Sequence, residues 1–498
     1  MSDRSKAGWA EMATAISPRT QAFIGGKTVA AASGATFTTI NPATGLPIAE
    51  IAACDREDVD RAVRAARAAF EKGVWSRAAP AERKKRLIHF AELIDRHRDE
   101  LALLETIDVG KPIGDSLAVD LPLTATCIRW YGEAIDKIYD EIAPTAPTAI
   151  SLMRREPLGV VAAVVPWNFP LLMSAWKIGP VLAAGNSLIL KPAEQSPLSA
   201  LRLAELAAEA GIPEGVFNVV PGLGETAGRA LGLHGDVDAV TFTGSTEVGK
   251  YFMTYSGQSN LKRVSLECGG KSPHIVLADA PDLDAAATAA AWGIFYNQGE
   301  VCNAGSRLIV EESIRDAFVE KVIAVAKEIR VGDPLDPQTQ MGPVVDSSQM
   351  DRVLAYIEKG RGEGADLRLG GGRIAGSDGY FIAPTLFDRV DNRMTIAQEE
   401  IFGPVLSVIT ARDADDAFCI ANDTIYGLAA GVWTSNIDTA FKASSTLKAG
   451  VIWVNCFDHG DISSPFGGFK QSGFGRDKSL HAIDKYSDIK TTWINLGR

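Results

Sequence analysis

The chain has 498 residues, of which 46% are hydrophobic and 22% charged, so we expect a folded globular protein of two or three domains. Its net charge of −12 excludes nucleic acid as the expected partner, because phosphates require basic patches. The six cysteines contain no CxxC pair and the six histidines no HExxH-type spacing. These absences exclude a disulfide framework, and we expect no metal.

The N-terminal residues 1–17 contain no apolar signal core, so we expect a protein that stays in a reducing cytoplasm. Residues 159–185 are almost entirely apolar, with Lys177 as their only charge. Three prolines and Asn168 interrupt this stretch, whereas a membrane-spanning helix needs about 20 uninterrupted apolar residues. We therefore expect a buried strand, a loop and a helix here.

Amphipathic helical patterns alternate with short apolar runs along the chain. The helical patterns cover residues 56–72, 80–105, 198–210 and 314–329. The apolar runs cover residues 160–165, 187–191, 217–220, 239–244 and 274–278. Such alternation predicts βαβ units around a largely parallel sheet. A second α/β stretch follows from about Leu308, with the boundary near residues 267–270. Residues 488–496 alternate like an exposed strand, which we expect to pair with a neighbouring subunit.

Two strand ends in the first α/β stretch indicate a dinucleotide site. Residues 244–249, "GSTEVG", follow an apolar strand and open a helix, where backbone N–H groups can approach a phosphate. An ordinary tight turn is the alternative. Lys191 and Glu194 follow another strand and could bind the hydroxyls of an adenosine ribose, although a solvated ion pair is the commoner case. Ligands of α/β folds bind at such strand ends, so the two motifs together predict dinucleotide binding.

Three side chains have the chemistry of covalent catalysis. Glu267 ends an apolar strand before two glycines, where burial would raise its pKa and suit a general base; a turn-stabilising acid is the alternative. Cys302 lies among glycines with no histidine nearby, and is either an activated nucleophile or a small buried hydrophobe. Cys268 remains a competing thiol. Asn168, beside Trp167 in "VPWNFPL", could donate to an oxyanion or could serve only a loop turn.

The ordered set of motifs resembles one family. Over residues 23–498 the order and spacing are similar to those of the NAD(P)-dependent aldehyde dehydrogenase superfamily. The matching motifs are "VPWNFPL", "KPAEQSP", "FTGSTEVG", "LECGGKSP", "NQGEVC", "EEIFGPV" and "SPFGGFKQSG". The resemblance implies an enzyme of α/β class with the aldehyde dehydrogenase fold.

The resemblance also implies a role for each matching residue. Cys302 is then the nucleophile, Glu267 the general base, and Asn168 with the Cys302 backbone N–H the oxyanion hole. The implied cofactor contacts are Trp167, Lys191, Glu194, Gly244, Ser245, Glu400 and Phe402. A carboxylate at residue 194 would repel a 2′-phosphate, so we expect NAD as cofactor, with NADP possible but weaker. Cys268, where the family commonly has leucine, is then a packing residue.

The implied reaction starts with attack of the Cys302 thiolate on an aldehyde carbonyl. The resulting thiohemiacetal loses hydride to NAD and becomes a thioester, which water activated by Glu267 hydrolyses to a carboxylic acid. The presence of this base favours hydrolysis over acyl transfer to CoA. A cysteine-dependent esterase without redox chemistry is one alternative. A binding or structural protein that keeps the fold is another, against which the intact catalytic set argues.

The family fold implies three parts. They are a doubly wound NAD-binding domain (residues 1–128 and 149–266), an α/β catalytic domain (267–475) and a small β oligomerisation arm (129–148 and 476–498). Strand addition between arms implies a homodimer or homotetramer. Neither nucleic acid nor a membrane is an expected partner.

The expected substrate is an ω-amino aldehyde. Gly460 in the loop 455–468 would leave a wide tunnel, and nearby acids would attract a cationic tail. The expected substrate contacts are Asp120, Phe169, Trp176, Phe457, Asp458 and Asp461. The sequence is most similar to γ-glutamyl-γ-aminobutyraldehyde dehydrogenases of putrescine breakdown, which supports this expectation. In one alternative, the three acids Asp120, Asp458 and Asp461 are only solvated and contact no substrate. In the other, the protein is a broad-specificity aliphatic, aromatic or betaine aldehyde dehydrogenase.

Overall fold

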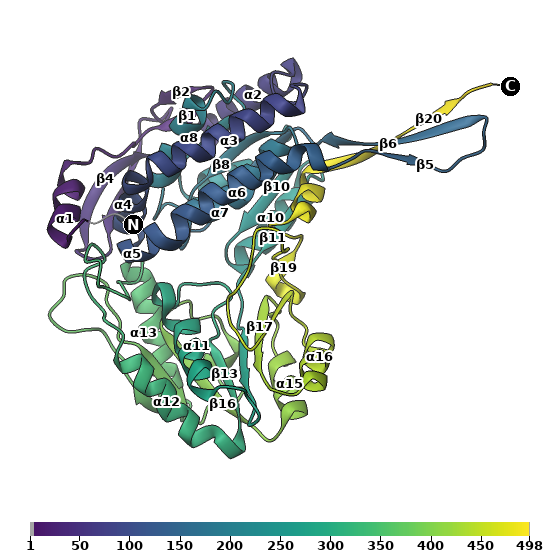
Figure 1. The fold of residues 1–498 in the computed structure, drawn as a ribbon. Coiled ribbons are helices and arrows are strands. Elements are labelled where there is room, and N and C mark those ends of the chain that lie inside the picture. The colour runs from purple at the N-terminus through teal and green to yellow at the C-terminus, as the bar shows by residue number, and fades with distance from the viewer. Residues whose placement is uncertain (1–3, 498) are drawn as a thin grey trace.

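The computed structural model describes residues 4–497, so the expected domain ends at residues 1–3 and 498 lie outside it. Two α/β units form the body of the molecule, and a β arm that carries the C-terminus projects from it (Figure 1). Across residues 4–497, no helix is both long and apolar enough to cross a membrane.

The first unit is built on an eight-stranded sheet. In spatial order its strands are β19 (Gly473–Phe474), β11 (Arg263–Glu267), β10 (Ala239–Thr243), β7 (Val160–Val164), β8 (Ser187–Lys191), β9 (Phe217–Val219), β1 (Ala22–Ile24) and β2 (Lys27–Val29). The five strands from β11 to β9 are parallel, and β10, β7, β8 and β9 are buried along their whole length, as expected for strands covered on both faces. The strand order reverses between β7 and β10, and ligands of doubly wound sheets bind beyond such a reversal.

Ten helices of the described chain precede β11. They are α1 (Lys6–Ala15), α2 (Arg56–Lys72), α3 (Pro80–Arg96), α4 (Arg98–Val109), α5 (Ile113–Asp115), α6 (Leu121–Ala134), α7 (Pro170–Ala183), α8 (Leu198–Glu209), α9 (Arg229–Leu233) and α10 (Thr246–Gln258). The helix expected over residues 80–105 is therefore two helices, which meet at His97. A two-stranded sheet of β3 (Thr36–Asn41) and β4 (Leu46–Ala52) lies between β2 and α2 in the sequence.

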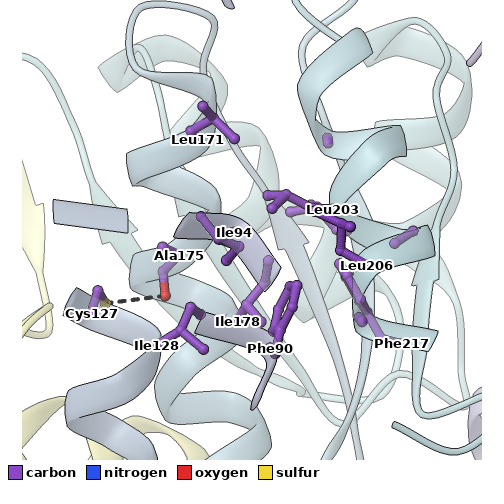
Figure 2. Packing of buried hydrophobic residues seen from close by; sticks show 14 of the residues in the cluster. Phe90, Ile94, Cys127, Ile128, Leu171, Ala175, Ile178, Leu203, Leu206 and Phe217 are labelled. Atoms are coloured by element: carbon purple, nitrogen blue, oxygen red, sulfur yellow. Dashed lines mark hydrogen bonds between the residues drawn. The ribbon is translucent and has the colours of Figure 1, made fainter. Parts of the chain in front are cut away.

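The core of the first unit is formed by apolar side chains from the sheet and the helices around it, α3, α4, α6, α7 and α8 above all. Figure 2 shows part of it: Phe90, Ile94, Cys127, Ile128, Leu171, Ala175, Ile178, Leu203, Leu206 and Phe217. Each large apolar side chain buried in this way contributes about 1.5–3 kcal/mol. The Cys127 thiol donates to the Ala175 carbonyl at 3.4 Å, which satisfies its one polar group. This cysteine therefore joins α6 to α7 and belongs to the packing.

The second unit is built on a seven-stranded sheet. In spatial order its strands are β14 (Asp366–Leu369), β15 (Thr385–Asp388), β16 (Val405–Ala411), β13 (Arg307–Glu311), β12 (Pro273–Val276), β17 (Ala429–Trp433) and β18 (Val451–Val454). All but β14 are parallel to their neighbours. Its helices are α11 (Leu283–Phe295), α12 (Arg315–Lys327), α13 (Ser347–Gly362), α14 (Thr395–Gln398), α15 (Ala414–Asn422) and α16 (Ile437–Thr446).

The arm is a three-stranded antiparallel sheet of β20 (Ser487–Asn495), β6 (Ala149–Pro157) and β5 (Glu141–Ala143). It differs from the expected ranges in two ways. The sheet continues through residue 157, where residue 148 was expected as the limit, because β6 pairs with β20 along its whole length. Residues 129–134 belong to α6 in the body. In addition, β19, expected within the second unit, pairs with β11 at the edge of the first sheet.

Candidate active site

One cavity of about 440 Å³ opens beyond the carboxyl ends of β7, β10 and β11, at the reversal in strand order. Its other walls come from α6 and α7 of the first unit and from α13, β18 and several loops of the second. The three residues expected to carry the chemistry, Asn168, Glu267 and Cys302, all line it. The sheet order thus brings together side chains that lie up to 134 positions apart in the sequence.

Cys302 lies in a loop whose backbone is unusual. Two residues shortly before it, Asn297 and Gln298, have left-handed φ values of 45° and 58°, which cost energy in residues other than glycine. On the other side Gly270 packs against the Cys302 carbonyl oxygen, which a Cβ at residue 270 would approach to 2.5 Å. The thiol is therefore held by close backbone packing that larger residues would disrupt.

Burial raises the pKa of the Cys302 thiol, and the carboxylates of Glu400, Asp458 and Glu267 raise it further. The thiol is therefore protonated at rest. Its conversion to the reactive thiolate requires a group that accepts the proton.

Asn168 is held by two buried hydrogen bonds, one from its side-chain amide and one to its backbone carbonyl. Its Nδ2 donates to the Glu300 carbonyl at 2.7 Å, and the Asn297 Nδ2 donates to the Asn168 carbonyl at 3.1 Å. Asn168 is 4% exposed and follows β7 directly. An amide held in this way at the cavity wall is a preorganised donor for negative charge on a substrate oxygen.

Glu267 is the last residue of β11 and is 4% exposed, yet neither carboxylate oxygen has a hydrogen-bond partner within residues 4–497. Burial raises its pKa well above the ordinary value, and the negative charge of Asp477 adds to the shift. Gly467 lies so close that a Cβ there would stand 2.7 Å from Glu267 Oε1. A buried carboxyl without partners at a cavity wall is suited to accept a proton from water or a thiol.

A buried ionic group next to Glu267 was not predicted from the sequence. The Asp477 carboxylate accepts a hydrogen bond from Lys177 and another from Lys485 at 2.5 Å. Lys177 and Asp477 are both fully buried. The signal was present, since Lys177 is the only charge within residues 159–185, and a buried lysine needs an anionic partner.

The Glu400 carboxylate also lines the cavity. It accepts a hydrogen bond from the Gly270 N–H at 3.0 Å, and burial raises its pKa to about 7. A Cβ at Gly269 would stand 1.9 Å from Glu400 Oε2, so only glycine fits there. Phe402 and Trp167 pack edge to face, with ring centroids 5.2 Å apart. A carboxylate and an aromatic pair at one wall fit the ribose and ring of a nicotinamide nucleotide.

The other predicted cofactor contacts lie at the neighbouring strand ends. Ser245 caps the N-terminus of α10 by accepting from the Val248 N–H at 3.2 Å. Lys191 ends β8 opposite Val164 of β7, and its Nζ donates to Glu194 at 3.2 Å. Gly244 and Ser245 line the 440 Å³ cavity, whereas Lys191 and Glu194 lie outside its wall. A ligand that spans all four would be elongated, as a dinucleotide is.

Two further residues of this wall were missed because they belong to a helix with no local motif. Gln349 and Arg352 of α13 line the cavity. The Gln349 Nε2 donates to the Phe402 carbonyl at 2.6 Å, and an Arg352 NH2 donates to the Glu400 carbonyl at 2.8 Å. Together they hold the segment that carries Glu400 and Phe402, where Phe402 has a left-handed φ of 60°.

The structure separates the predicted substrate contacts into two groups. Phe169, Trp176 and Asp458 line the cavity, and the Asp458 carboxylate accepts from the Asn303 amide at 2.6 Å. Phe457, although adjacent to Asp458, stacks on His274 with ring centroids 4.6 Å apart and lies outside the cavity wall. The prediction for Phe457 was therefore wrong.

Two predicted acids do not face the cavity either. Asp120 is fully buried, and its Oδ1 accepts from Lys111 Nζ at 2.6 Å, beside a second bond from the same lysine to Glu105. It is the cation of this buried group, Lys111, that touches the cavity wall, 3.7 Å from the centroid of the Phe169 ring. Asp461 is exposed and accepts from the Ser463 hydroxyl at 2.6 Å. Neither lines the cavity, so both predictions were wrong.

Cys268, the competing thiol, is 4% exposed and packs against Gly249, where a Cβ would stand 2.9 Å from its sulfur. Burial raises its pKa to about 12. Although it borders the cavity, its tight packing against α10 agrees with a packing role. Within residues 4–497, no group of three His, Cys, Asp or Glu side chains is placed to hold a metal ion.

This fold and site are those of a known class. The sequence matches the aldehyde dehydrogenase family over residues 29–492, and the chain belongs to that family. It is an NAD-dependent aldehyde dehydrogenase, an oxidoreductase, as the sequence predicted.

The chain is similar in sequence or structure to three named aldehyde dehydrogenases. The NADP/NAD-dependent aldehyde dehydrogenase PuuC of Escherichia coli is 52% identical over 98% of both chains. The structure of γ-glutamyl-γ-aminobutyraldehyde dehydrogenase from Burkholderia cenocepacia has a TM-score of 0.98 and 56% identity, over 99% of this chain and 100% of that one. Indole-3-acetaldehyde dehydrogenase AldA of P. syringae, solved as a C302A mutant with NAD+ and IAA, has a TM-score of 0.98 and 57% identity, with the same coverage. These similarities confirm the predicted family, fold and cofactor.

Proposed function

We propose that this enzyme oxidises ω-amino aldehydes, γ-glutamyl-γ-aminobutyraldehyde among them, to carboxylic acids through a thioester on Cys302. The mechanism is supported by one observation: the Cys302 thiol, the fixed Asn168 amide and the unpartnered buried carboxyl of Glu267 all line a single cavity. The substrate proposal is supported by Asp458, a carboxylate that lines the same cavity as the aromatic ring of Trp176.

The reaction begins when the Cys302 sulfur, after loss of its proton, forms a bond to the aldehyde carbon. Negative charge develops on the former carbonyl oxygen, where the Asn168 amide and the Cys302 backbone N–H stabilise it. Glu267 is the acceptor that we assign to the thiol proton, because it is an unpartnered carboxylate of the same cavity and burial raises its pKa. Glu267 thus serves the first step as well as the last.

NAD, when bound, supplies the acceptor for the hydride that leaves the thiohemiacetal carbon. Glu400, Phe402 and Trp167 would hold its nicotinamide half, and Lys191, Glu194, Gly244 and Ser245 its adenosine and phosphates. Loss of hydride leaves the acyl group on the Cys302 sulfur. Glu267 then takes a proton from water, the hydroxide oxygen bonds to the acyl carbon, and the C–S bond breaks to release the carboxylate.

We assign a role to each part of the molecule on the same basis. The eight-stranded unit would bind NAD and the seven-stranded unit would supply Cys302. The arm would pair with another copy of the chain, since its apolar residues are exposed. Examples are Tyr139 at 79%, Ile142 at 72% and Trp493 at 64%. Strand addition by exposed edges of this kind produces closed dimers or tetramers.

A second candidate is oxidation of neutral aromatic or aliphatic aldehydes. Much of the outer cavity is apolar, with Leu123, Trp453 and Phe466 at its wall, and the ring centroids of Trp176 and Phe466 are 5.2 Å apart. A flat aromatic substrate would pack well there. The similar P. syringae enzyme, named for indole-3-acetaldehyde, makes this candidate concrete.

NADH formation with a matched panel of aldehydes tests the two candidates. The panel comprises γ-glutamyl-γ-aminobutyraldehyde, 4-aminobutyraldehyde, butyraldehyde and indole-3-acetaldehyde. We expect the γ-glutamyl compound to have the highest kcat/KM. Equal or better use of butyraldehyde or indole-3-acetaldehyde would favour the second candidate and reject the first.

A further inference from the structure

The part of the cavity wall formed by Asp458, Gly460 and Lys478, which we call the mouth, contains a cation as well as an anion. Lys478 lines the same wall as Asp458, and neither the acidic tunnel expected from the sequence nor the reaction itself accounts for it. If the substrate tail carried only an amine, the Lys478 ammonium at the same wall would weaken its binding, because like charges repel. The presence of Lys478 therefore indicates that the substrate tail carries an anion.

The Lys478 ammonium is available to a ligand. It makes no hydrogen bond or ion pair with the chain over residues 4–497, and its Nζ lies 5.7 Å from the centroid of the Trp176 ring. The residue is half-buried, and burial lowers the pKa of Lys478, against the opposing charges of Asp461 and Asp458. A partly desolvated cation with no bonded partner gains more from an incoming carboxylate than an exposed lysine does.

The backbone holds both charges at the mouth in an uncommon conformation. Asp458 has a φ of 56° and Lys478 a φ of 61°, both left-handed. For residues other than glycine this conformation costs roughly 1–2 kcal/mol each. Gly460 packs closely against the Lys478 ammonium, since a Cβ there would stand 3.2 Å from Lys478 Nζ. Strained backbone that presents opposite charges at the wall of one cavity points to a ligand with both charges.

We propose that Lys478 binds a carboxylate at the far end of the aldehyde chain while Asp458 faces an adjacent ammonium. The preferred substrates would then be aldehydes whose tail ends in an amino-acid group, rather than aldehydes with a bare amine. This inference rests on the proposed oxidation of ω-amino aldehydes. It narrows that class by adding the anion and makes Lys478 a specificity-determining residue.

The inference is tested with Lys478→Met, which removes the charge and keeps an unbranched apolar chain, and with Lys478→Arg, which keeps the charge. Three aldehydes separate the contributions of the tail. They are γ-glutamyl-γ-aminobutyraldehyde, its glutaryl analogue, which lacks only the ammonium, and butyraldehyde. Lys442→Met is the matched control, because Lys442 is an exposed residue of α16 that pairs with Asp415 at 2.5 Å, away from the cavity.

In Lys478→Met, kcat/KM for the γ-glutamyl and glutaryl aldehydes should fall roughly 10- to 100-fold, the usual effect of losing a charged hydrogen bond. With butyraldehyde it should change less than about twofold. Lys478→Arg should retain most activity on both tailed aldehydes, and Lys442→Met should match wild type throughout. An equal fall with all three aldehydes would show a structural role for Lys478 and overturn the inference.

The remaining outcomes separate this inference from the function on which it rests. If wild type prefers the tailed aldehydes and Lys478→Met keeps that preference, the inference fails alone. If wild type uses butyraldehyde as well as the tailed aldehydes, both the substrate proposal and the inference fail.

Discussion

The inner end of the cavity and its mouth are built differently. At the inner end, Asn168 and Glu267 follow buried parallel strands, and Cys302 is packed backbone to backbone against Gly270. At the mouth, Asp458 and Lys478 lie on loops in left-handed conformations. Sheet edges hold side chains precisely enough for chemistry, whereas loops can change without disturbing the sheet. The reaction and the choice of aldehyde are therefore separable properties of this molecule.

The largest effect should follow from Cys302→Ala. Without the sulfur no covalent intermediate forms, so dehydrogenase activity should fall by at least about 10³-fold with every aldehyde. NAD affinity, measured by fluorescence titration, should stay within about threefold of wild type, because the change leaves the strand ends intact. Substantial remaining turnover would assign the nucleophile to another residue, of which Cys268 is the first to test.

Glu267→Gln should slow turnover by about 10³-fold through loss of the base that activates water. Rapid mixing with aldehyde and NAD should then show the acyl-enzyme accumulate, detected by mass spectrometry of the acid-quenched protein. The tail preference should be unchanged, since Glu267 belongs to the inner end. Unchanged steady turnover would mean that a different base hydrolyses the thioester.

Asp120→Asn separates a structural acid from one that contacts substrate. It removes a charge from the buried group of Lys111 and Glu105, so we expect a loss of about 3 kcal/mol in the free energy of unfolding. The ratio of kcat/KM between tailed and untailed aldehydes should stay the same. Denaturant titration measures the first quantity and steady-state kinetics the second. If the ratio of kcat/KM changed and the free energy of unfolding did not, Asp120 would have to be assigned to the substrate site after all.

The pH dependence of deacylation should reflect Glu267. Because burial raises its pKa, the carboxyl is protonated, and inactive as a base, below that raised value. Turnover limited by deacylation should therefore rise with pH, by about tenfold per pH unit on the acid side, and level off once the carboxyl is ionised. Glu267→Gln should lose this rise. A wild-type profile that is flat on the acid side would show that Glu267 does not limit turnover.

The smallest effect should come from Asp461→Asn. Its side chain is exposed and bonded to Ser463, outside the cavity wall, so kcat/KM for a cationic aldehyde should change less than about twofold. Asp458→Asn provides the contrast at the same loop, with an expected loss of about tenfold for amine-bearing aldehydes only. Equal losses in the two variants would mean that long-range charge at the loop, rather than contact at the wall, selects the substrate.

Local sequence was sufficient for the parts of the site that follow strands. Lys191, Ser245 and Glu267 each come directly after or end an apolar run, and a parallel sheet brings such ends to one edge. Gln349 and Arg352 could not be found in this way, because their positions depend on how α13 packs against the segment that carries Glu400.

Errors arose where a side chain's direction depended on distant partners. Asp120 was expected to contact the substrate, but it pairs with Lys111, nine positions earlier in the sequence. Only the fold determines that the two side chains meet. Phe457 and Asp458 are adjacent, yet only Asp458 lines the cavity, because Phe457 stacks on the distant His274 ring instead. The limit of the arm was misplaced for the same reason, since β6 is defined by pairing with β20, more than 300 residues later.

The edge strand β19 has a consequence for biosynthesis. Glu267 pairs with Thr243 on one side, but its neighbour on the other side, Gly473, is synthesised late, and Asp477 and Tyr486, which reach back to Lys177 and Thr241, come later still. A nascent chain can therefore contain Cys302 long before the neighbourhood of its base is complete. Domains fold largely in the order in which they leave the ribosome. We therefore expect the enzyme to be inactive during translation. It should become active only when the segment from β19 to β20 has folded back onto the first sheet.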